Sequence, residues 1–117
     1  MKILSTLILS TALVGCVSGR PELTVEQLRR VDEMKVFKIG TTPEREFKVI
    51  SAVEAADCSG LGGSRLYGDE GNAIDILKMK AAAIGGDAVV DVSCGSAPFV
   101  NNCWAAKKCD GKAVSWK

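Results

Sequence analysis

The spacing of apolar residues predicts a helix near the start of the chain. Over residues 20–34 the apolar positions recur every three or four residues, as on one face of a helix. Thr24 and Gln27 have the spacing of a capping box, which marks a helix start. The stripe continues through Val31 and Met34 toward the first strand, so the helix is expected either to lie on the domain or to act as a stiff spacer before it.

A second helix is predicted over residues 73–84. Asn72 can cap its start, and Gly85-Gly86 is typical of a helix end. The apolar positions that we expect to face the core are Ile74, Leu77, Ala81 and Ile84.

Alternating apolar and polar positions predict strands over residues 36–39, 47–53, 88–94, 103–109 and 112–117. Asp110-Gly111 is the signal of a two-residue hairpin turn between the last two strands. The glycine-rich residues 58–71 and residues 95–102 are expected to be loops. The sequence therefore predicts an α+β fold: a small mixed or antiparallel sheet, packed by one main helix and preceded by a short N-terminal helix.

Charge and composition exclude several classes of function. The chain has 117 residues, with 15 basic and 14 acidic side chains and no histidine. There is no basic excess to bind nucleic acid, and the commonest general base and metal ligand is absent. Because no nucleophile has a base at a supporting spacing, we expect no enzymatic activity, no cofactor and no small-molecule substrate.

The N-terminus has the pattern of an export signal. Met1-Lys2 precedes an apolar run of twelve residues from Ile3 to Val14, which is too short to span a bilayer. Leu13-Val14-Gly15-Cys16 resembles the lipobox of bacterial lipoproteins. This resemblance implies cleavage after Gly15 and attachment of acyl chains such as palmitate to Cys16. The alternative is an ordinary signal peptide with an incidental cysteine.

The residues after Cys16 bear on localisation. In Gram-negative lipoproteins, an aspartate just after the lipidated cysteine resembles an inner-membrane retention signal. Val17-Ser18 contain no aspartate. The resemblance therefore implies an outer-membrane lipid anchor with the domain in the periplasm. We expect residues 1–15 to be a removed signal peptide, residues 16–34 a lipidated tether with a helix, and residues 35–117 a disulfide-bonded domain.

The four remaining cysteines are Cys58, Cys94, Cys103 and Cys109. An even number in an exported chain predicts two disulfides, and the lack of a CxxC motif argues against a metal site. Cys103 and Cys109 lie six residues apart on one predicted strand, about 20 Å, which is too far for a bond between them. Two pairings remain open: 94–103 with 58–109, favoured by a simple hairpin, and 58–103 with 94–109.

Other polar and aromatic residues were weighed as sites. The stretch 59–65 lacks the strand–loop–helix context of an anion-binding loop, and the acids Asp69, Glu70 and Asp75 are expected at a helix start rather than on a cation. Tyr67, Trp104 and Trp116 are candidates for the core or for contact with a partner. Trp104 follows Cys103, so its side chain points either to the helix or to a partner.

The order of these motifs is similar to that of a known family. A lipobox is followed by SAVEAADCSG, then by LKMKAAAIGGDAVVDVSC, and finally by CWAAKKC and a last strand. Over residues 34–117 and the lipobox, this order resembles RcsF, the outer-membrane lipoprotein sensor of the Rcs envelope-stress phosphorelay. The resemblance implies interleaved disulfides, Cys58–Cys103 and Cys94–Cys109.

The resemblance also implies partners and a mechanism. It implies a non-enzymatic signalling protein that contacts an IgaA-like inner-membrane regulator, a BamA-like barrel assembly component, or both. The family has a long proline-rich linker after the lipid, whereas here Val17 to Lys35 contain a single proline, Pro21. A second interpretation is therefore a structural lipoprotein that scaffolds the envelope or assists barrel assembly, and a third is a lipoprotein that binds a small ligand or metal.

Overall fold

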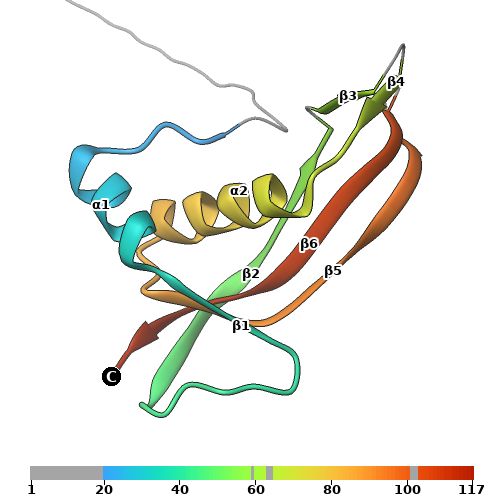
Figure 1. The fold of residues 1–117 in the computed structure, drawn as a ribbon. Helices are drawn as coiled ribbons and strands as arrows, with labels where there is room; N and C mark the ends of the chain where they lie inside the picture. The colour runs from blue at the N-terminus through green and yellow to red at the C-terminus, as the bar shows by residue number, and fades with distance from the viewer. Residues whose placement is uncertain (1–19, 59, 63–64, 101–102) are drawn as a thin grey trace, which may run out of the picture.

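The fold is a mixed β-sheet with one long helix lying across one face and a short helix at its end (Figure 1). A computed structural model describes residues 20–58, 60–62, 65–100 and 103–117. The elements in chain order are α1 (Val25–Glu33), β1 (Lys35–Lys38), β2 (Phe47–Asp57), β3 (Gly60–Gly62), β4 (Arg65–Tyr67), α2 (Glu70–Ala83), β5 (Ala88–Val100) and β6 (Cys103–Trp116). The predicted α+β class, with one main helix and a short helix before the sheet, is confirmed.

Strand β6 organises the sheet because it pairs with three other strands. From Cys103 to Val114 it runs antiparallel to β5, and β1 adds to β5 in parallel. On its other side, β6 pairs with β2 over Lys107–Trp116 and with β4 over Cys103–Ala105. Strand β3 completes the sheet beside β4. The partner of β6 thus changes between Ala105 and Lys107, where the last residue of β4, Tyr67, and the last residue of β2, Asp57, lie opposite β6.

The predicted hairpin turn at Asp110-Gly111 is wrong, because these residues lie inside the continuous strand β6. The hairpin is formed instead by β5 and β6, with Val100 opposite Cys103. Gly111 is needed for close packing: a Cβ there would lie 2.9 Å from the Val89 Cγ1 atom and 3.0 Å from Val92 Cγ2. The Asp110-Gly111 dipeptide is typical of a turn, but here Gly111 allows the neighbouring strands to approach each other closely.

Two predicted loops also contain strands. Strand β5 continues through residues 95–100, and the glycine-rich stretch 58–71 includes β3 and β4. Residues of this kind have low strand propensity, so pairing with β6 and not local preference decides their conformation.

The main core lies between α2 and the sheet. The side chains of α2 that are buried there are Ala73, Ile76, Leu77, Ala81 and Ala82. Ile84, which was expected in this stripe, is 45% exposed beyond the helix end. The helix also begins earlier than predicted, because Asp69 rather than Asn72 is the cap and its side chain accepts a hydrogen bond from the Asn72 backbone nitrogen at 2.9 Å.

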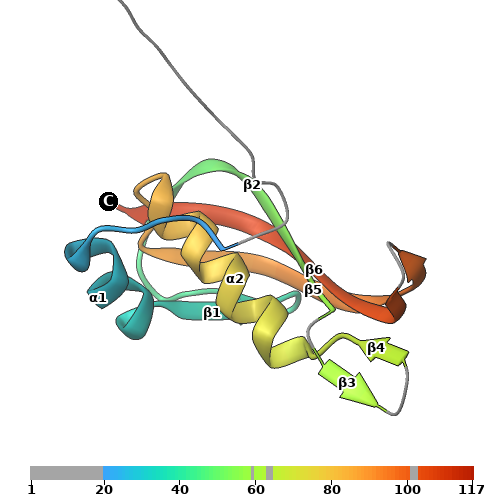
Figure 2. The ribbon, with the colours of Figure 1, turned by 90° about the horizontal axis from the view of Figure 1, so that it is seen from above.

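A second, smaller core lies on the opposite face of the sheet. It buries Ala88, Val90 and Val114 under the partly buried rings of Phe37, Phe47 and Trp116. Strands β1 and β2 lie at opposite edges of this part of the sheet, so the connection between them, residues 39–46, passes across its end on the side away from α2 (Figure 2). This crossing places Arg45 over the ring of Trp116, which packs on the second core.

Of the two roles predicted for the N-terminal helix, a helix on the domain or a stiff spacer before it, the structure shows the first for α1. It packs against α2, with Val31 against the main core and the Gln27 side-chain nitrogen 3.5 Å from the Ala82 carbonyl oxygen. The predicted capping box is confirmed: the Thr24 hydroxyl accepts from the Gln27 backbone nitrogen at 3.1 Å, and the Gln27 side chain accepts from the Thr24 nitrogen at 2.8 Å.

Loss of this cap gives a small, measurable effect. Thr24→Ala removes the acceptor for the Gln27 nitrogen, so we expect the free energy of unfolding to fall by about 1 kcal/mol in urea denaturation. The matched control is Thr42→Ala, an exposed threonine outside any helix, for which we expect a change within about 0.5 kcal/mol. Equal effects of the two substitutions would contradict the capping role.

Candidate functional site

The proposed lipid-attachment residue, Cys16, lies outside the described residues, which begin at Arg20. From Arg20 onward the chain runs beside α2, and the Arg20 guanidinium lies 3.4 Å from the Met79 sulfur. Within the described part of the chain, no helix is both long enough and apolar enough to cross a membrane.

On α1, the charged side chains pair with each other at the surface. The hydrogen bond and charge of Arg29 lower the pKa of Glu26, and Glu26 in turn raises the pKa of Arg29. Both side chains are exposed, so this ion pair contributes little to folding.

Cys94 and Cys109 form a disulfide directly across the β5–β6 pair, with their Cα atoms 4.0 Å apart. Cys109 is fully buried and belongs to the main core beside α2, and the half-buried Cys94 packs against the same core. This is one of the two bonds that the resemblance to RcsF implies. The alternative bond 94–103, which assumed a simple hairpin register with Cys94 opposite Cys103, is wrong because Cys94 lies opposite Cys109.

Cys58 follows the end of β2 and is also disulfide-bonded. Cys103 is the first residue of β6, and its backbone lies opposite Val100 of β5 and Leu66 of β4. The side chain of Cys103 lies outside the described part, so the Cys58–Cys103 pair stays a prediction.

Two of the three acidic residues considered as cation ligands, Asp69 and Glu70, have other contacts. Asp69 caps α2, and the Glu70 carboxylate accepts from the Lys38 ammonium at 3.0 Å. Asp57, which is 5% exposed, accepts a hydrogen bond from the Asp69 backbone nitrogen at 2.8 Å and thereby ties the end of β2 to the start of α2. Among the described residues, no group of three potential metal ligands comes together.

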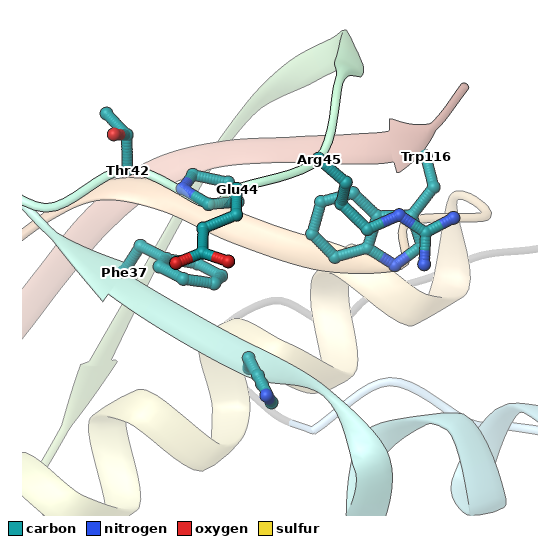
Figure 3. A pocket seen from close by; sticks show the side chains of 7 residues that line it. Phe37, Thr42, Glu44, Arg45 and Trp116 are labelled. Carbon is teal, nitrogen blue, oxygen red and sulfur yellow. The ribbon is translucent and has the colours of Figure 1, made fainter.

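A groove lies at the end of the sheet, and nothing in the sequence pattern predicts it. It encloses about 620 Å³ between β1, the 39–46 connection and the end of β6. The residues that line this groove are Lys35, Phe37, Thr42, Pro43, Glu44, Arg45 and Trp116. Figure 3 shows Arg45 stacked over the indole ring of Trp116 and Glu44 near Phe37.

The charged side chains of the groove form no ion pair with another described residue. The Arg45 guanidinium carbon lies 4.6 Å from the centroid of the Trp116 ring, a cation–π contact. None of the ion pairs found between described residues includes Lys35, Glu44 or Arg45. The groove therefore presents two cations and one carboxylate around aromatic side chains.

Sequence reasoning found only one residue of this groove, Trp116, as an aromatic candidate. Nothing in the periodicity of residues 39–46 shows that this segment crosses the sheet. Trp104, which was chosen as the partner contact, and Tyr67 have side chains outside the described part, so the contact role of Trp104 stays a prediction.

Comparison with known proteins supports the fold and leaves the family open. No protein-family model matches the sequence, and no curated protein matches it. A crystal structure of a protein of unknown function from Pediococcus pentosaceus, belonging to the DUF74 family, is similar with a TM-score of 0.54. The match has 16% sequence identity and covers 73% of this chain and 99% of that chain. At this identity the similarity shows the α+β fold alone.

Proposed function

We propose that this protein is an outer-membrane lipoprotein, anchored through acyl chains on Cys16, that signals envelope stress by protein–protein contact in an Rcs-type phosphorelay. The observation that carries the proposal is the order of a lipobox, a short tether and a domain stapled by Cys94–Cys109. Disulfides persist in the oxidising periplasm, so the bond agrees with the export signal.

The tether favours a second candidate function. Because the chain lies beside α2 from Arg20 onward, only residues 17–19 separate the lipid from the folded part. Fully extended, three residues span about 10 Å. A partner at the outer membrane, such as a BamA-like barrel assembly component, is within this reach, whereas an IgaA-like inner-membrane regulator must extend toward the domain. The second candidate is therefore a structural lipoprotein that assists barrel assembly.

Substitution of Cys16 tests the anchor. In Cys16→Ser we expect no incorporation of labelled palmitate and loss of the protein from the outer-membrane fraction, because the thiol that would carry the first acyl chain is gone. Ser18→Ala is the matched control and should retain both. Palmitate labelling of Cys16→Ser at the wild-type level would contradict the proposal.

A stress reporter separates the two candidate functions. Overproduction of the wild-type protein should raise an envelope-stress reporter at least about fivefold if the protein is a sensor, a response that corresponds to about 1 kcal/mol of shifted equilibrium. A silent reporter, combined with detergent sensitivity of the deletion strain, would reject the sensor and support the structural role.

A further inference from the structure

The groove at Trp116 has a layered chemistry that points to a particular ligand. Its floor is aromatic, because Phe37 and Trp116 are half-buried over the second core. Its rim is charged, with Lys35 on β1 and Glu44 and Arg45 on the 39–46 connection, all three exposed. An aromatic floor inside a rim of unpaired charge is typical of sites that anchor one apolar group and orient one ionised group.

Arg45 is positioned for a carboxylate. Stacking on the indole occupies one face of its planar guanidinium group and leaves the N–H edges free. These edges match the two oxygens of a carboxylate, and Lys35 adds a second positive charge at the same groove. The negative charge of Glu44 would repel a ligand that carries several negative charges. The groove therefore suits a single carboxylate better than a cluster of phosphates.

We propose that this groove binds a peptide segment of a partner protein that presents a carboxylate beside an aromatic or branched aliphatic side chain. The apolar side chain packs on Phe37 and Trp116, and the carboxylate pairs with Arg45 and Lys35. Within the described residues β1 pairs only with β5, so its outer edge can also offer backbone groups to an extended segment. This inference rests on the proposed protein–protein function and names the surface that performs it.

The recognition chemistry is tested with defined fragments. We expect N-acetyl-phenylalanine to bind with a millimolar Kd, followed by nuclear magnetic resonance shifts of the backbone at residues 35–37 and 42–45 and of the Trp116 indole. N-acetyl-phenylalanine amide lacks the carboxylate and acetate lacks the ring, so each should bind at least about tenfold more weakly. Equal binding of acid and amide, or no shift of these residues at 20 mM acid (roughly tenfold above the expected Kd), would overturn the proposal.

Charge reversal supplies the matched variants. Lys35→Glu/Arg45→Glu should weaken binding of N-acetyl-phenylalanine at least about tenfold, because both attractive charges become repulsive. Lys48→Glu/Lys78→Glu reverses two lysines outside the groove and should leave binding unchanged. Both pairs change exposed or half-exposed side chains, and a thermal melt of each variant confirms that the domain is folded. Equal weakening in the two pairs would overturn the proposal.

The reporter strain distinguishes failure of this inference from failure of the proposed function. If wild-type protein raises the reporter and the groove variant does not, the groove is the signalling surface. If both raise it equally, the peptide-binding role is wrong although the sensor role stands. If the wild-type protein does not raise the reporter, the sensor role fails, and photocrosslinking from position 42 to a purified BamA-like component tests the peptide-binding role. A crosslink that is lost in the groove variant supports this role. The absence of a crosslink overturns it.

Discussion

Gly68→Ala is expected to abolish folding or to lower the free energy of unfolding by at least about 4 kcal/mol. Gly68 joins β4 to α2 at the point where β6 exchanges its partner β2 for β4. A Cβ at this position would overlap the Asp57 carbonyl oxygen and the Lys107 backbone nitrogen. Both atoms belong to the paired ends of β2 and β6, so neither can move without breaking the ladder.

The control for this substitution is Gly95→Ala. Gly95 lies in β5 opposite Lys108, and a Cβ there meets no atom within 4 Å. Alanine is the better strand residue, so stability should stay within about 0.5 kcal/mol or rise slightly. Circular dichroism and urea denaturation measure both variants. A Gly68→Ala protein with the stability of Gly95→Ala would show that the junction is not as tight as the structure indicates.

The same junction shows where sequence reasoning ends. The fold class, the presence of both helices, the capping box of α1 and the position of Cys103 and Cys109 on one strand follow from local pattern, whereas the start of α2 at the Asp69 cap does not. The roles of Gly68 and Gly111 do not, because they depend on which backbone lies nearby after folding. A glycine in a sequence can indicate either a turn or a close approach of two backbones. Only the tertiary structure distinguishes the two.

The groove illustrates a second limit. Trp116 and Phe37 are 79 residues apart in the chain, and the short crossing by residues 39–46 brings Arg45 onto the tryptophan. Apolar periodicity predicts which face of an element is buried, but it carries no information on where a connection crosses a sheet. The choice of Trp104 as the contact residue followed strand alternation alone, and the charged rim near Trp116 was therefore missed.

Removal of the Cys94–Cys109 bond should destabilise the domain by about 3 kcal/mol, because the two cysteines are 15 residues apart and the bond restricts the unfolded chain. For a domain of roughly 100 residues this corresponds to a fall in Tm of about 12–24 °C. Cys94→Ala/Cys109→Ala is the appropriate variant. A serine at position 109 would add a hydroxyl to a fully buried site in the apolar core, which carries its own cost.

Ser93→Ala, an exposed neighbour on β5, is the control and should melt within about 2 °C of the wild-type protein. The paired backbones of β5 and β6 remain in the alanine variant, so we expect a native circular dichroism spectrum at low temperature and an early melt. A Tm within about 5 °C of wild type would show that strand pairing and the α2 core hold this hairpin without the bond. The expected early melt would instead make formation of the Cys94–Cys109 bond a condition for a stably folded groove, since β6 carries both Cys109 and Trp116.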